Sequence, residues 1–259
     1  MTWPVIRAGA QGAAASRHVL ALLLLALAWP AARAAPAQGT IAISFSDGPA
    51  RLVRDKAVYR AGRGVVLREN DMLEAGAGVL QLGSGAASIA LGPAARLYVR
   101  NGAELVLLDG WLKLQAAPDR PLTVGAPNLR LASTGNTIIV RASREATELF
   151  AESGDTQVQE LNPGKAARPT RLAHEQFAVR AGALPLRTAA RPPAAFLAAL
   201  PPSFRDQLVP LSVAGAAAPT FERAASFAEL APWLATQPLL RRQVQARFDP
   251  PPPTMKARP

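Results

Sequence analysis

The regular alternation of apolar and polar residues between Asp71 and Val140 constrains the fold more than any other feature of the chain. Large apolar residues recur there at positions i and i+2, which lie on the same face of a β-strand. Eight such pairs occur: Leu80 with Leu82, Ile89 with Leu91, Leu97 with Val99, Leu105 with Leu107, Leu112 with Leu114, Leu122 with Val124, Leu129 with Leu131, and Ile138 with Val140. The pattern predicts a run of short strands, each with one buried face.

Turn residues separate successive pairs. They are Gly83–Gly85, Gly92–Pro93, Asn101–Gly102, Asp109–Gly110, Pro118–Asp119, Gly125–Pro127 and Gly135–Asn136. Many short strands with a turn signal every several residues predict a mainly β protein with a single all-β domain. A β-solenoid or roll and a sandwich-like fold both produce this alternation, so both remain open.

Weaker strand patterns lie on both sides of the alternating region 71–140. Ile41, Ile43 and Phe45 alternate, and Asp47-Gly48 predicts a hairpin turn into a strand near Leu52. The stretches 145–160 and 172–180 continue the pattern on the other side. We therefore predict one all-β domain over residues 35–187.

The apolar period changes from that of a strand to that of a helix near the C-terminus. A linker is predicted over 188–193, which carries Pro192-Pro193, and a short helical segment over 194–249. Helical spacing is seen in 194–200, in 203–211 and in 221–247, where a further helix begins at Pro238. The tail 250–259 opens with consecutive prolines and is predicted to be disordered.

Residues 1–34 have the features of a cleavable signal peptide. Arg7 and Arg17 precede an apolar run, Val19 to Trp29, which is shorter than the roughly 20 residues that span a bilayer. Ala32-Arg33-Ala34 provides a small-x-small cleavage site, so Ala35 becomes the expected mature N-terminus. The chain has no cysteine, and therefore no disulfide or lipid-modified cysteine. We expect a periplasmic protein; an uncleaved membrane anchor is the alternative.

The formal charge of +11 does not by itself identify a partner. The arginines are scattered through strands, linkers and tail, and no nucleic-acid-binding motif accompanies them. Nucleic acid is therefore not an expected partner. An acidic glycan facing the basic surface remains an alternative.

No catalytic or metal-binding motif stands out. His174 is the only histidine after the predicted cleavage site, and a metal site needs three or four ligands. The chain lacks H-E-x-x-H, G-x-S-x-G and S-x-x-K. We therefore expect no enzyme activity, no cofactor and no catalytic, cofactor-binding or metal-binding residue.

Two groups of carboxylates could in principle form a glycosidase-like pair. One contains Asp71 and Glu74, and Asp71 is typical of a turn. The other contains Glu145, Glu148 and Glu152, which lie near Arg141 and Arg144 and more simply indicate surface ion pairing.

The remaining candidate binding residues are more typical of structural positions. Gly76, Gly78, Gly83 and Gly85 match neither the dinucleotide nor the P-loop spacing, and they punctuate strands instead. Trp111 begins the strand of Leu112 and Leu114 and is predicted to lie in the core or at its rim.

Three short motifs, taken together, resemble the periplasmic FecR domain over about residues 41–158. The stretch 67–76 (LRENDMLEAG) is similar to L-x-x-G-D-x-I-x-T-G, with Asn70 in place of glycine. Residues 135–140 (GNTIIV) are similar to G-T-x-F-x-V, and 152–158 (ESGDTQV) to the closing V-x-x-G-x-V-x-V. Gly83-Ser84-Gly85 stands where the family has D-G-S. Residues 233–248 are similar to a helical extension that follows such domains.

The resemblance implies a β-rich, non-enzymatic domain that acts by protein contact. Only eighteen residues precede the apolar run, which is too few for the cytoplasmic domain of a FecR-type sigma regulator. We therefore expect an interaction or sensing module that contacts another envelope protein. The alternatives are a peptidoglycan- or carbohydrate-binding protein and a membrane-anchored FecR-type signalling regulator.

Overall fold

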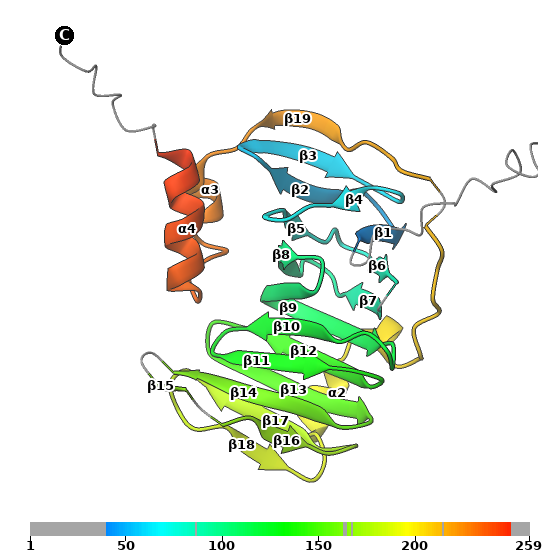
Figure 1. Ribbon diagram of the computed structural model, residues 1–259, viewed down its shortest axis with the longest axis vertical. Helices are drawn as coiled ribbons and strands as arrows, with labels where there is room; N and C mark the ends of the chain where they lie inside the picture. Colours follow the sequence, from blue (N-terminus) through cyan, green and yellow to red (C-terminus); the bar gives the residue numbers. More distant parts are fainter. Residues whose placement is uncertain (1–39, 86, 163–164, 167, 214, 250–259) are drawn as a thin grey trace, which may run out of the picture. The chain divides into compact units, whose positions relative to one another are not determined.

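The computed structural model describes residues 40–85, 87–162, 165–166, 168–213 and 215–249, all within one compact unit. The predicted signal peptide and tail lie outside these residues. The described chain is mainly β, with short helices near its C-terminal end, which confirms the predicted fold class (Figure 1). The strands form two layers, here called sheet A and sheet B.

Sheet A is antiparallel throughout. In spatial order its strands are β4 (Val66–Leu67), β1 (Ile41–Ser46), β6 (Leu80–Ser84), β7 (Ala87–Leu91), β9 (Glu104–Ala116), β12 (Thr137–Ala142), β13 (Ala146–Ser153), β17 (Phe177–Ala181) and β18 (Arg187–Ala189).

Sheet B is antiparallel except where β9 meets β10. In spatial order its strands are β19 (Thr220–Ala224), β3 (Ala57–Ala61), β2 (Ala50–Arg54), β5 (Met72–Glu74), β8 (Arg96–Asn101), β9, β10 (Leu122–Ala126), β11 (Leu129–Ser133), β14 (Thr156–Asn162) and β16 (Thr170–Leu172). A short strand, β15 (Lys165–Ala166), pairs with the end of β14.

One strand, β9, belongs to both layers. Its first half pairs with β8 and β10 in sheet B, and its second half pairs with β7 and β12 in sheet A. The change occurs at Asp109-Gly110, so the predicted turn there is wrong. Gly110 has φ +90°, and a Cβ at this position would lie 2.7 Å from the Cα of Ala95. Glycine therefore lets one continuous strand bend from one layer into the other.

The turn signals mark two different kinds of connection. Gly83–Gly85, Asn101–Gly102 and Gly125–Pro127 lie at hairpins within one layer. Gly92–Pro93, Pro118–Asp119 and Gly135–Asn136 lie where the chain crosses between layers. The predicted hairpin at Asp47-Gly48 is wrong for the same reason, because β1 lies in sheet A and β2 in sheet B.

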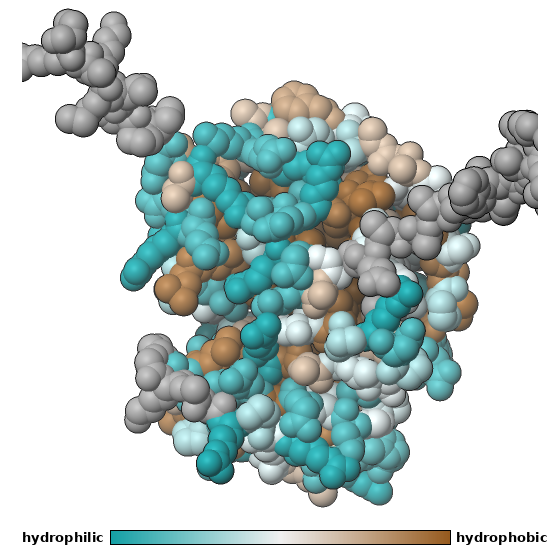
Figure 2. Space-filling view, in the orientation of Figure 1, coloured by the Kyte–Doolittle hydropathy of each residue, from teal (hydrophilic) through white to brown (hydrophobic). Residues whose placement is uncertain are grey.

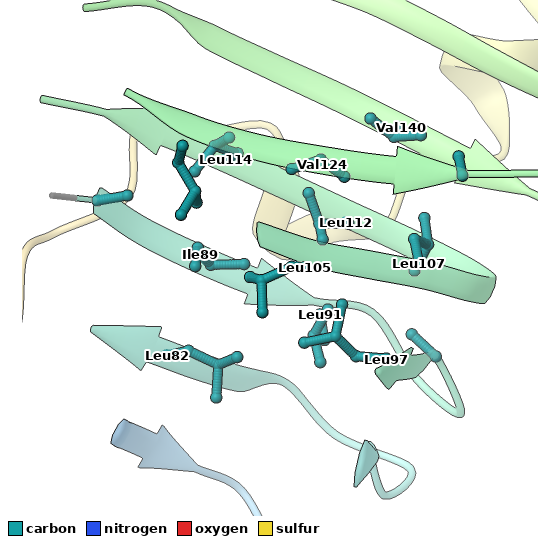
Figure 3. Packing of buried hydrophobic residues seen from close by; sticks show 14 of the residues in the cluster. Leu82, Ile89, Leu91, Leu97, Leu105, Leu107, Leu112, Leu114, Val124 and Val140 are labelled. Carbon is teal, nitrogen blue, oxygen red and sulfur yellow. The ribbon is translucent and has the colours of Figure 1, made fainter. Parts of the chain in front are cut away.

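The main core lies between the two layers. All sixteen residues of the eight apolar pairs belong to it, each with at most 2% of its surface exposed. Figure 3 shows Leu82, Ile89 and Leu91 of sheet A with Leu97 and Leu105 of sheet B. Truncating one such leucine to alanine costs about 2–5 kcal/mol, so this core is the main source of stability.

The outer face of sheet B is covered by helices. Apolar side chains on this face include Val53, Met72 and Tyr98, and they pack on α3 (Phe227–Leu230) and α4 (Pro238–Phe248). Trp233 and Val244 are buried in this second cluster. The helical segment therefore packs on the β-domain, and the helix predicted to begin at Pro238 is confirmed.

The outer face of sheet A is covered by the preceding part of the chain. Phe196 in α2 (Ala194–Ala198) and Phe204 in η2 (Pro202–Phe204) pack over Ile139 and Phe177. The chain then passes β6, where Gln81 Nε2 donates to the carbonyl of Val209 at 2.7 Å. Residues 190–213 and 215–249, here called the C-terminal segment, thus contact the outer faces of both layers (Figure 1).

Three parts of the C-terminal region differ from the predicted elements. Residues 187–189, part of them predicted as linker, pair with β17 as β18. The helix predicted from Phe221 begins only at Phe227, because residues 220–224 pair with β3 as β19. The helical spacing over 203–211 yields only the one turn of η2. Pro210 disfavours helical geometry at Val209, and side chains of sheet A donate to the carbonyls of Asp206 and Val209.

Candidate functional site

The two carboxylates of the first candidate pair, Asp71 and Glu74, take part in separate sets of ion pairs. Asp71 is 1% exposed and accepts hydrogen bonds from Arg54 Nε at 2.9 Å and Arg54 Nη2 at 2.6 Å. Glu74 instead pairs with Arg51 at 3.2 Å and Arg96 at 2.9 Å. The hydrogen bond with Asp71 is the main cause that raises the pKa of Arg54 above its ordinary value. Asp71 is therefore a structural anion that holds its arginine in place.

Asp71 also shapes the turn predicted at this point. The backbone N–H of Arg68 donates to Asp71 Oδ2 at 2.7 Å, and the backbone N–H of Asp71 donates to the carbonyl of Arg68 at 3.1 Å. Asn70 has φ +73°, the left-handed conformation that glycine adopts without strain.

The three carboxylates of the second candidate set, Glu145, Glu148 and Glu152, also have different partners. Glu148 pairs with Arg141 at 3.3 Å, which confirms the predicted ion pairing for this residue. The pKa of Glu145 is lowered, first by a hydrogen bond from the Ser143 hydroxyl. Glu152 pairs instead with Lys113, a partner that the sequence pattern does not predict. The three carboxylates thus have separate partners and do not form a shared site.

Lys113 is the most deeply buried cation on the outer face of sheet A. Its side chain has no exposed surface, and Nζ lies 2.7 Å from Glu152 Oε2. The same ammonium donates to the carbonyls of Phe204 and Asp206, both at 2.8 Å. Lys113 therefore fastens the C-terminal segment to the sheet.

The remaining candidates have structural surroundings. His174 is exposed in the crossing between β16 and β17. Gly76 and Gly78 lie between β5 and β6, which confirms that they punctuate strands. Trp111 packs on Phe196 with ring centroids 5.1 Å apart, at the rim of the outer cluster on sheet A.

Within the described residues, no group of three or more His, Cys, Asp or Glu side chains is placed to hold a metal ion. The helices of the same residues are all too short or too polar to cross a bilayer.

An exposed edge strand is the first surface suited to binding. β19 pairs with β3 on one side, and none of the described strands pairs with its other side. All five of its residues are exposed, including Phe221 at 62%. The Phe221 ring stands edge-on to Tyr59 with centroids 5.9 Å apart. Figure 2 shows moderately apolar residues at the top of the view, where Figure 1 draws β19.

A pocket of about 510 Å³ is the second surface suited to binding. It lies where β2, β5 and the turns beside them meet α4. The pair of Arg54 and Asp71 forms one part of its wall, and Val53, Met72 and Val244 supply apolar surface.

Comparisons with known proteins give only partial likenesses. No family model matches the chain, and no curated protein matches it. Two crystal structures of a "putative anti-sigma factor" from Parabacteroides distasonis ATCC 8503 resemble it at 13% and 12% sequence identity, each with a TM-score of 0.40. The likeness covers 46% of this chain and 59% of that one, so the chain spans less than two thirds of their length.

Proposed function

We propose that the protein is an exported, non-enzymatic module that acts by contact with another protein of the cell envelope. The observation that carries this proposal is the open edge of β19. Export is supported by the signal features of residues 1–34. The pairing of buried charges with one another supports a binding role over a catalytic one, since Asp71 and Lys113 hold the fold together.

Strand addition is the mode of contact that the edge favours. β19 comes from residues 220–224 and pairs with β3 at residues 57–61, so this end of sheet B already accepts an extended segment distant in sequence. The carbonyl of Ala224 accepts a hydrogen bond from Arg223 Nη1 at 3.1 Å. Along the rest of its outer side, β19 pairs with no other described strand and can accept a further one. The exposed ring of Phe221 would add apolar contact to a partner with a complementary side chain.

Site-specific cross-linking tests this proposal. A photo-reactive amino acid replaces Phe221 in the protein expressed in its native cells, and a matched control replaces Leu239, which is 73% exposed on α4. We expect one protein partner to be captured at position 221 and not at 239. Equal capture at both positions, or capture at neither, would contradict the use of this edge.

Two further measurements separate the alternatives. Retention on purified cell-wall sacculi that is insensitive to Phe221→Glu would favour peptidoglycan binding over protein contact. N-terminal sequencing of the protein from cells addresses export, because Ala35 at the N-terminus indicates cleavage and an intact N-terminal segment indicates an anchor.

A further inference from the structure

The mouth of the pocket beside α4 carries an excess of positive charge. Apart from the internally paired Arg54 and Asp71, its charged residues are the cations Lys56, Arg68 and Arg247 and the acids Asp55 and Glu69. Across the described residues, none of these three cations has a carboxylate within 4.0 Å. These three cations and two acids together give the pocket mouth a net charge of +1.

Arg247 is held in place without being neutralised. Its Nη2 donates to Asn70 Oδ1 and lies 3.3 Å from the hydroxyl of Tyr98, which itself donates to the same Asn70 oxygen at 2.6 Å. Its other guanidinium N–H groups have no partner among the described residues. A guanidinium fixed by neutral groups keeps its full charge for a ligand and loses less conformational entropy on binding.

Lys56 occupies a strained backbone position at the same mouth. It follows Asp55 in the turn between β2 and β3, with φ +93°, where glycine would be unstrained. Such a conformation is unfavourable for a residue other than glycine. A lysine there indicates a use for its ammonium group, because the turn alone would be better served by glycine.

We propose that this pocket binds a small organic anion, a carboxylate or a phosphate monoester, that carries an apolar chain. The volume of about 510 Å³ lies in the usual range of roughly 300–1,000 Å³ for small-molecule sites. Lys56, Arg68 and Arg247 supply donors for the anionic group, and Val53 and Met72 supply apolar contact. The pocket adjoins the end of β19, where the backbone N–H of Ala225 donates to the Lys56 carbonyl at 2.8 Å, but no β19 residue lines it. Binding in the pocket therefore does not require the proposed protein contact.

Isothermal titration of the full chain with three eight-carbon probes tests the inference: octanoate, octyl phosphate and octylamine. We expect the two anions to bind and the amine not to bind. Tighter binding of octanoate would identify a carboxylate ligand, and tighter binding of octyl phosphate a phosphate monoester. Binding of octylamine as tight as that of both anions would overturn the proposal.

Two variants and a control locate the binding site. Lys56→Gly and Arg247→Gln should each weaken binding of the tighter anion by about tenfold or more, since each removes a charged donor. Arg242→Gln, on the exposed side of α4 and outside the pocket, should leave binding unchanged. Lys56→Gly relieves backbone strain, so its melting temperature should equal or exceed that of the wild type. Unchanged affinity in both pocket variants would refute the site.

Discussion

Replacing Lys113 with methionine tests whether a buried cation fastens the C-terminal segment to sheet A. Methionine keeps most of the apolar stem but removes the ammonium, which lies 2.7 Å from Glu152 and 2.8 Å from the carbonyls of Phe204 and Asp206. The side chain of Lys113 is fully buried, whereas that of Glu152 is 28% exposed. The substitution therefore leaves one carboxylate that water can reach and two carbonyls that lose their donor.

The expected cost follows from these surroundings. Removing one partner of a buried ion pair costs about 3–5 kcal/mol when the other remains buried. Glu152 can regain some hydration, which favours the lower end of that range. We therefore expect Lys113→Met to lower the free energy of unfolding by about 3 kcal/mol. Arg60→Met is the matched control: its pair with Glu222 has side chains 63% and 36% exposed, so it should cost less than about 1 kcal/mol.

Urea denaturation followed by circular dichroism measures both variants, and a double-mutant cycle with Glu152→Met isolates the ion pair. Glu152→Met should be costly in the wild type and nearly neutral in the Lys113→Met background. Hydrogen exchange should show the earliest loss of protection around Phe204. A cost for Lys113→Met no greater than that for Arg60→Met, or additive effects in the cycle, would refute the reasoning.

Three further changes have defined outcomes. Gly110→Ala places a Cβ 2.7 Å from a neighbouring backbone atom and should destabilise by about 2 kcal/mol or more in urea titrations, whereas Gly182→Ala, with open space around it at φ +53°, should cost only about 1 kcal/mol. Phe196→Ala should cost about 3–5 kcal/mol in the same assay, because the ring is 1% exposed within an aromatic cluster. A hydrogen bond from Arg223 lowers the pKa of Glu229 below its ordinary 4.5, so its stabilising effect is present above about pH 4.5 and is lost as the pH falls below it. Thermal melts should thus separate Glu229→Gln from wild type by more at pH 7 than at pH 3.

The inward face of the β-domain could be predicted from the sequence because its alternation is local. Each pair such as Leu112 and Leu114 needs only the period of a strand to be placed on one face. The layer of each strand could not be predicted in the same way. Glycine, asparagine and aspartate occur both in hairpins and in crossings between layers. At Asp109-Gly110, aspartate and glycine instead lie inside a strand that bends.

The candidate sites were harder to predict because they depend on contacts between distant parts of the chain. Lys113 alternates with inward leucines, so the local pattern places its ammonium in solvent. The pattern contains no sign that residues 204 and 206 cover it. The pocket likewise joins Lys56 and Asn70 to Arg247, and no local period connects residues nearly two hundred positions apart.

Strands with apolar residues on both faces are the one sequence feature that indicates the packing of the C-terminal segment on the sheets. In β2, Leu52 faces the main core and its neighbour Val53 faces outward, yet both are buried, at 0% and 5% exposed. A sheet with two apolar faces requires a cover on each. Sheet A obtains its cover from α2 and η2, and sheet B from α3 and α4. Because α4 also closes the pocket that contains Arg247, an anion bound there would stabilise the docking of the helix on sheet B.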